Sequence, residues 1–265
     1  MPDPVLLQID DGVARVTLNR PAVLNAINTE MKGALEAALR GIAADSSCRV
    51  VILAGNGPGF MAGGDVREFE KAVDLAPAER RVAFERRVGE AQALMLLMRR
   101  LPIPVVASVH GAVAGFGMSL MMAADLALAA ADTVFTLAYC HLGLSPDGGA
   151  TFFLPRQIGA KKAMEIALLG ERFDAATALA LGLVNRLVPA ADLATETDRL
   201  AQRLSHGPAA ALAATKRLLV QSLGASIESQ LQAEQESFAA CAATADFAEG
   251  VAAFLAKRPP RFGRS

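Results

Sequence analysis

Apolar and polar residues alternate near the start of the chain and then take up helical spacing. Val5 to Asp10 and Val13 to Leu18 alternate on either side of Asp11-Gly12, which predicts a hairpin. Beyond it, Asn28 or Thr29 caps a predicted helix whose apolar residues recur every three or four positions, at Met31, Leu35, Ala38, Leu39 and Ile42. The first third of the chain is therefore predicted to mix strands and helices.

Two continuous apolar runs, Val50 to Leu53 and Val105 to Val109, predict strands that are covered on both faces. Each run leads into a glycine-rich turn, which lies at Phe60 to Asp65 in the first case and at His110 to Gly117 in the second. Shorter elements follow the second turn: a helix, Met118 to Ala124, and two strands, Leu126 to Ala129 and Val134 to Thr136. The pattern predicts an α/β core.

Charged residues crowd between Arg67 and Arg87, before the chain turns apolar again from Ala91 to Met98. This pattern predicts an exposed segment that leads into a long helix, and it is the best candidate for a lid. After Pro155 the sequence is mostly helical. We therefore expect an α/β core over residues 1–190 and a C-terminal helical region over residues 191–265, which serves trimer formation or covers the site.

The uncharged stretch from Leu101 to Ala124 is long enough to span a bilayer. Prolines open it, Ser108 and His110 interrupt it, and three glycines break its middle. This arrangement favours a buried strand, a glycine turn and a helix over a membrane span. We expect no membrane association.

Composition narrows the class of protein further. The 265 residues carry 26 Lys and Arg against 27 Asp and Glu, which excludes a strongly basic nucleic-acid-binding protein. With 53% hydrophobic residues and 5% aromatic ones, the chain builds a large core from aliphatic side chains, mainly as one large domain. Its three cysteines have no CxxC spacing, which argues against a disulfide framework and a zinc site. The N-terminus lacks a signal-peptide pattern, so we expect a cytoplasmic protein.

The two glycine-rich turns are the most informative chemical feature. Each turn can present free backbone N–H groups where a helix begins, and such groups bind phosphates or, when two converge, an oxyanion. Neither turn matches a Walker loop, because no Lys-Ser/Thr pair follows. Taken alone, a glycine-rich turn is most often ordinary packing.

Together with their surroundings, these turns resemble the enoyl-CoA hydratase/isomerase family, also called the crotonase superfamily. The likeness covers nearly the whole chain and rests on six segments: Asn19-Arg20-Pro21 with Leu24-Asn25-Ala26, Phe60 to Asp65, Gly115-Phe116-Gly117 with Ala124-Asp125, Leu142 to Gly149, Leu154-Pro155-Arg156, and Asp246 to Gly250 with Phe254 to Arg258. The resemblance implies a spiral of strand-strand-helix units with a C-terminal helical region. It also implies a homotrimer or a dimer of trimers.

The resemblance implies that the N–H groups of Gly64 and Phe116 form an oxyanion hole for the thioester carbonyl of an acyl-CoA. Other positions that match the family's substrate contacts are Ala22, Val23, Leu24, Ala26, Ala62, Gly63, Asp65, Val66, Gly115, Tyr139, Phe254 and Lys257. Ala22 stands where many relatives carry a CoA-binding lysine, and Arg67 is a possible substitute. Lys257 is equally well explained as a cation at the end of a helix.

The acidic residues of the site distinguish hydratases from isomerases within this family. The two glutamates that hold water in hydratases of this family match Ser119 and Tyr139, neither of which is a good general base at neutral pH. Asp147 remains, at the position of an acidic residue in the family's isomerases. One carboxylate can remove a proton at one carbon and return it to another. Its neighbours Pro146 and Gly148 alone favour a turn residue or helix cap, whereas the resemblance favours a catalytic carboxylate.

These observations predict an enzyme that isomerises an enoyl-CoA or a ring-epoxide acyl-CoA in fatty-acid or aromatic-acid breakdown. Enoyl-CoA hydration is the alternative, if Asp147 alone positions a water molecule. A catalytically inactive acyl-CoA-binding scaffold is the alternative from another class, and RNA binding is disfavoured by the neutral charge balance. We expect no metal and no cofactor apart from the coenzyme A that forms part of the substrate.

Overall fold

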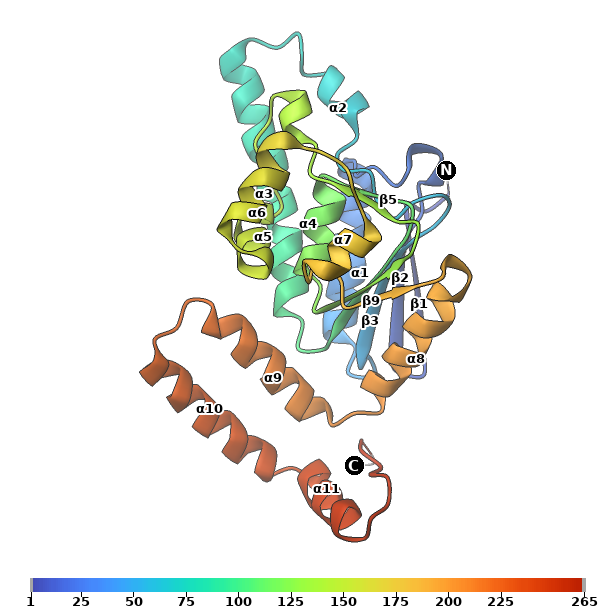
Figure 1. The fold of residues 1–265 in the computed structure, drawn as a ribbon, viewed down its shortest axis with the longest axis vertical. Helices are drawn as coiled ribbons and strands as arrows, with labels where there is room; N and C mark the ends of the chain where they lie inside the picture. Colours follow the sequence, from blue (N-terminus) through green and yellow to red (C-terminus); the bar gives the residue numbers. More distant parts are fainter. Residues whose placement is uncertain (1, 264–265) are drawn as a thin grey trace.

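The computed structural model describes residues 2–263, and its main sheet follows the predicted strand pattern (Figure 1). Six strands lie in the order β1-β2-β3-β4-β6-β9, where only β1 and β2 are antiparallel. In the predicted hairpin, Val5 pairs with Leu18. The strand bounds are β1 (Val5–Asp10), β2 (Val13–Leu18), β3 (Val50–Gly55), β4 (Val105–Val109), β6 (Leu126–Ala130) and β9 (Arg186–Val188).

A second, smaller sheet contains the strands β5 (Ala112–Ala114), β7 (Val134–Thr136) and β8 (Phe173–Asp174). β5 lies inside the segment predicted as a glycine turn, because single bridges from Gly59 and Met61 extend this sheet alongside it. The chain thus passes from the main sheet to the smaller one and then into a helix, several times in succession. The predicted spiral of strand-strand-helix units is confirmed.

The helices are α1 (Thr29–Ala44), α2 (Val66–Glu70), α3 (Pro77–Arg100), α4 (Phe116–Ala123), α5 (Ala150–Ile158), α6 (Ala160–Leu169), α7 (Ala175–Ala180), α8 (Leu193–Ser205), α9 (Ala209–Ser222), α10 (Ile227–Ala242) and α11 (Ala245–Leu255), with short 3-10 turns at Pro21–Val23, Tyr139–Leu142 and Ala190–Asp192. Asn28, one of the two expected caps, accepts the Met31 N–H at 2.9 Å. The charged segment is helical from Pro77 onward, and the Ala76 N–H donates to Glu79 at 3.3 Å. A proline at the first helical position favours this earlier start.

The two faces of the main sheet are covered by different helices. One face packs with α1, α3 and α4, and the other packs with α8. Val51 and Leu53 point to the first face, whereas Val50 and Ile52 point to the second, where they meet Leu200 and other apolar residues of α8. Burial on both faces explains why the sequences of these strands are continuous apolar runs.

The helices α9, α10 and α11 extend away from the body of the molecule, at the orange to red end of the chain (Figure 1). Large apolar side chains on them are exposed, with Phe238 at 78% and Phe254 at 83% of full exposure. A buried ion pair anchors α9 to the body: Lys216 Nζ lies 2.7 Å from Asp125 Oδ2 and 2.9 Å from the Ile103 carbonyl. We call α9 to α11 the C-terminal arm.

We expect Asp125→Asn to destabilise the protein by about 3 kcal/mol, because it leaves the buried Lys216 ammonium without a counter-ion. Burial already lowers the pKa of Lys216, so its charge depends on Asp125. Urea denaturation of both proteins measures the difference. Glu165→Gln is the control, since it breaks the solvent-exposed Lys162–Glu165 pair and should cost less than about 1 kcal/mol. Equal small losses in both variants would contradict an anchoring role for Lys216.

Within residues 2–263, no single helix is long and apolar enough to cross a bilayer, although α10 and α11 meet the length and composition criteria jointly, with a 75° bend between them. The uncharged stretch examined in the sequence forms β4, β5 and α4.

Candidate active site

Two glycine turns far apart in the sequence meet at the start of α4. Gly63 and Gly115 both have positive φ angles, of 102° and 49°. They lie so close that a Cβ placed on Gly63 would be 3.6 Å from the Gly115 Cα and 3.7 Å from the Phe116 nitrogen. The close approach and the positive φ angles explain why glycine occupies both positions. The same approach places the Gly64 peptide beside the first turn of α4.

Backbone hydrogen bonds hold the first of these turns in place. The Ile27 N–H donates to the Gly63 carbonyl at 2.8 Å, and the Asp65 N–H donates to the Ile27 carbonyl at 3.0 Å. These bonds use the groups on either side of Gly64. Within the described residues, the Gly64 N–H has no backbone acceptor. It is therefore available to a bound oxygen atom.

The second turn supplies a second N–H group. Phe116 is the first residue of α4, so its N–H lies outside the hydrogen-bond ladder of the helix. All residues of α4 are buried, and its positive N-terminal end faces the Gly63-Gly64 turn. The two peptide groups can together stabilise negative charge on one oxygen atom.

Asp147 lines the same cavity as these groups, and hydrogen bonds hold both its side chain and its backbone carbonyl. Tyr139 donates its phenolic hydrogen to Asp147 Oδ1 at 2.6 Å, and the Ser119 hydroxyl donates to the Asp147 carbonyl at 2.9 Å. Gly148 follows with a φ of 59°, and a Cβ there would lie 2.8 Å from the Phe116 ring. Glycine at this position therefore lets the Asp147 turn pack directly onto α4.

The environment of Asp147 favours its neutral form more than water does. Burial raises the pKa of its carboxyl, whereas the Tyr139 hydrogen bond and the positive charges of Arg87 and Lys32 oppose this effect in part. Burial also raises the pKa of Tyr139, so the phenol stays protonated and acts as a donor. A carboxyl with a raised pKa suits the exchange of protons near neutral pH.

The two glycine turns, Tyr139 and Asp147 line one cavity of about 700 Å³. Of the residues predicted for the site, the cavity wall contains Ala62, Gly63, Gly64, Val66, Gly115, Phe116, Tyr139 and Asp147. Phe69 and Phe84 of the charged segment proposed as a lid also line it, as does Val88 directly after that segment. That segment therefore forms a wall of the cavity.

The remaining predicted residues lie outside the cavity wall. Ala22 and Val23 form the short turn before Leu24, whose carbonyl accepts the Ala62 N–H at 2.9 Å. Asp65 caps α2 by accepting the Arg67 N–H at 3.1 Å, and it pairs with Arg20 at 3.0 Å. Arg20 also contacts the carbonyl of Ala26. Residues 20–26 therefore hold the first glycine turn in place through these contacts.

Phe254 and Lys257 lie on or beside α11, at the opposite end of the molecule from α2 (Figure 1). Phe254 lines a separate groove on the C-terminal arm. Within one chain, the structure does not bring these two residues to the cavity.

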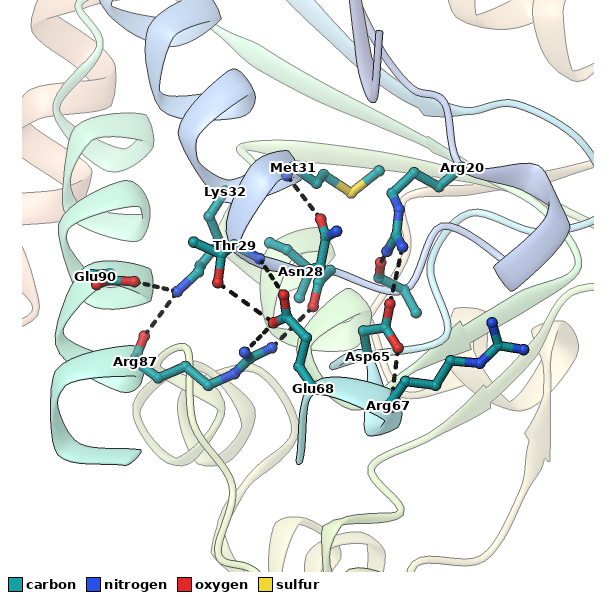
Figure 2. Close-up of polar contacts among 12 residues, drawn as sticks. Arg20, Asn28, Thr29, Met31, Lys32, Asp65, Arg67, Glu68, Arg87 and Glu90 are labelled. Carbon is teal, nitrogen blue, oxygen red and sulfur yellow. Dashed lines mark hydrogen bonds and ion pairs between the residues drawn. The ribbon is translucent and has the colours of Figure 1, made fainter. Parts of the chain in front are cut away.

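Sequence reasoning missed a charged group in the cavity wall, shown in Figure 2. Lys32 of α1 contacts Glu90, and Arg87 of α3 contacts Glu68 of α2. The Arg87 guanidinium also donates to the Ile27 carbonyl at 3.2 Å and lies 4.9 Å from the centre of the Phe69 ring. Lys32 follows Met31 on the apolar stripe of α1, and that position was the only sequence signal for its burial.

Groups of three or more side chains with metal-binding chemistry are absent from the described part of the chain. The cavity wall instead offers two backbone donors, the phenol of Tyr139, the carboxylates of Glu85 and Asp147, and three cations. Such a set can stabilise an oxyanion and move a proton.

Comparisons with known proteins agree with this chemistry. Residues 8–265 match the model of a family described as "Enoyl-CoA hydratase/isomerase". The chain is 38% identical over 256 residues to a probable enoyl-CoA hydratase of Rhodobacter capsulatus, covering 96% of each protein. It is 35% identical to the 1,2-epoxyphenylacetyl-CoA isomerase of Escherichia coli, covering 97% of each. An enoyl-CoA hydratase from a Polaromonas species has a similar structure, with a TM-score of 0.92, 32% identity and coverage of 98% and 99%.

Proposed function

The chain belongs to the enoyl-CoA hydratase/isomerase family, and we propose that within this family it is an isomerase that shifts a double bond, or opens a ring epoxide, in an acyl-CoA thioester. The relatives include proteins named as hydratases and proteins named as isomerases. The observation that carries the choice is that Asp147 is the carboxylate hydrogen-bonded to Tyr139. The other carboxylate of the cavity wall, Glu85, is 62% exposed and pairs with Arg81 at 3.4 Å.

In the proposed reaction the thioester oxygen accepts hydrogen bonds from the Gly64 and Phe116 N–H groups. Loss of a proton from the carbon next to the thioester moves negative charge onto that oxygen. Two fixed donors stabilise the resulting enolate without reorganisation, and one such donor is typically worth about 3 to 4 kcal/mol in the transition state. This contribution is common to every reaction that passes through a thioester enolate.

Asp147 then carries the proton. For a 3-enoyl thioester, the ionised carboxylate removes a proton from C2, and the protonated carboxyl returns one to C4. The double bond moves into conjugation with the thioester, and Asp147 is ionised again at the end. The Tyr139 hydrogen bond keeps Oδ1 in place, which leaves Oδ2 for the proton transfers.

Hydration by the two-carboxylate route of the family needs a second acidic group to hold the attacking water. Ser119 and Tyr139 occupy the two positions where the resemblance places glutamates, and both side chains donate hydrogen bonds to Asp147. A hydroxyl and a neutral phenol are poor bases. Isomerisation requires one carboxylate, and Asp147 is the one that lies beside the two hydroxyl groups.

The assembly we propose is a trimer, alone or stacked as a dimer of trimers. The C-terminal arm leaves Phe254 and Leu255 exposed at 83% and 76%, which is unusual for a helix that remains isolated. In a trimer this arm covers a neighbour, and Phe254 and Lys257 then reach the coenzyme A of that neighbour. Light scattering tests this arrangement, and a dimer would contradict it.

The test of the proposed function compares a 3-enoyl-CoA with crotonyl-CoA. We expect ultraviolet absorbance of the conjugated thioester to rise with the 3-enoyl substrate, and the product mass to equal that of the substrate. Addition of one water to crotonyl-CoA, with no shift of the 3-enoyl double bond, would make the protein a hydratase. If both esters bind but neither is turned over, and a ring-epoxide ester is not turned over either, the result would favour the inactive scaffold.

We expect Tyr139→Phe to move the acidic limb of the kcat/KM profile to higher pH. The Tyr139 hydrogen bond stabilises ionised Asp147 and so lowers the pKa of that carboxyl, which burial raises. Without the bond, this pKa rises further and the active, ionised form appears only at higher pH. The pH dependence of kcat/KM for a 3-enoyl-CoA measures the shift. An acidic limb at the same pH in both enzymes would show that the phenol does not support the ionised carboxylate.

A further inference from the structure

Lys32 is an unexpected residue in the wall of an acyl pocket. Its side chain is 7% exposed, it lines the same cavity as Asp147, and its ammonium contacts Glu90 Oε2 and, at 3.4 Å, the Arg87 carbonyl (Figure 2). An ammonium has three N–H donors. Those two acceptors are its partners among the described residues, which leaves one donor for a group inside the cavity.

The charges around Lys32 do not cancel on the cavity side. The Glu90 side chain is 48% exposed, so water screens its negative charge, whereas Lys32 is buried. Arg87 adds a second cation. It pairs with Glu68, whose side chain is 21% exposed. Both cations act on the reaction centre, since the positive charges of Arg87 and Lys32 lower the pKa of Asp147 against the larger effect of burial. The lining side chains of α1 and α3 comprise three cations, Lys32, Arg81 and Arg87, and one carboxylate, Glu85. This wall is therefore electropositive.

Apolar side chains also line the part of the cavity wall that α2 and α3 form. Phe69, Phe84 and Val88 line it beside Arg87, and the polar Gln92 lies one helical turn beyond Val88. A plain alkyl chain would bury the Lys32 donor against hydrocarbon and leave it unsatisfied, which is unfavourable. An acyl group with an oxygen atom at that depth would satisfy it.

On the basis of the proposed function, we propose that the natural acyl group carries an acceptor oxygen away from the thioester, as a hydroxyl or a carboxylate, and that Lys32 is the residue that binds this oxygen. Lys32 is then a specificity-determining residue of the acyl pocket. Arg87 supports the wall by tying α3 to the Ile27 carbonyl and to Glu68.

Equilibrium binding of saturated CoA esters tests this inference without requiring turnover. Succinyl-CoA and 4-hydroxybutanoyl-CoA are compared with butanoyl-CoA, and adipyl-CoA and 6-hydroxyhexanoyl-CoA with hexanoyl-CoA, by calorimetry on the wild type and on Lys32→Met. At the chain length that reaches Lys32, we expect an oxygenated ester to bind about 10-fold or more tightly than its alkyl counterpart. The hydroxyl and carboxylate arms show which oxygen the site takes.

In Lys32→Met we expect this preference to disappear while the Kd of the alkyl esters changes by less than about 3-fold. Lys32→Arg keeps the charge and should retain part of the preference. Lys161→Met is the matched control, because Lys161 is an exposed lysine at the start of α6, outside the cavity wall, and this change should leave every Kd as it is.

Three results would overturn the inference. If the wild type shows no preference at either length, the pocket does not select an oxygen atom. If Lys32→Met weakens the alkyl and oxygenated esters equally, Lys32 is a structural link between α1 and α3. If no CoA ester binds to the wild type, the proposed function fails together with this inference, whereas tight binding of alkyl esters alone overturns only the inference.

Discussion

Asp147→Asn is expected to lower kcat for isomerisation of a 3-enoyl-CoA by about 100-fold or more. The amide has nearly the same shape as the carboxylate, and its oxygen can still accept the Tyr139 hydrogen bond that Asp147 Oδ1 accepts at 2.6 Å. It cannot take up or release the transferred proton. Steady-state kinetics by ultraviolet absorbance measure the loss, and calorimetry with butanoyl-CoA should show that the variant still binds an ester.

The matched control is Asp132→Asn, which changes an exposed aspartate outside the cavity wall and should leave kcat unchanged. Retention of more than about a tenth of the activity in Asp147→Asn would contradict the role of Asp147 as the proton carrier. Water addition to crotonyl-CoA that survives in this variant would return the protein to the hydratases.

Gly115→Ala is expected to lower kcat by about 100-fold through the backbone of the oxyanion hole. Gly115 has a φ of 49° and a ψ of −120°, a conformation that glycine favours. A Cβ would meet its nearest atoms only at 3.5 Å, so space is available and the strain falls on the backbone. Relief of that strain moves the Phe116 N–H away from the thioester oxygen, and loss of one such donor costs about 100-fold to 1,000-fold in rate.

Gly182→Ala is the control for strain alone. Gly182 also has a positive φ, of 79°, with no atom within 4 Å of a Cβ, and it lies outside the cavity wall. Both variants should lose a similar amount of thermal stability, on the order of 1–3 kcal/mol. We expect only Gly115→Ala to lose activity. A fall in the thermal midpoint with an unchanged kcat would show that the Phe116 N–H is not a donor in the reaction.

The main sheet could be predicted because its strands have a sequence pattern of their own. Val50 to Leu53 is apolar at every position since both faces of β3 are covered, and the Asp11-Gly12 turn fixes the pairing of β1 with β2. The strand β5 was missed because three small residues between glycines carry no strand pattern. It forms because the Phe60 loop and β7 lie alongside it.

The resemblance to the family predicted the centre of the candidate site, whereas nothing predicted the charged group in its wall. Gly64, Phe116 and Asp147 stand in short motifs, and the structure brings them to one cavity. Lys32 lies in an ordinary amphipathic helix, and its contact with Glu90 joins residues 58 positions apart. Nothing local marks such a pair, because its burial depends on how α3 packs on α1.

The order of strands has a consequence for synthesis on the ribosome. The apolar face formed by Val50, Ile52 and Val106 is covered by α8, whose residues Leu193 and Leu200 come about 140 positions after β3 begins. At ~5–20 residues per second, this face stays open to water for on the order of ten seconds in every new chain. The nascent chain therefore exposes an apolar sheet face for much of its translation, and this exposure favours aggregation until α8 has been synthesised.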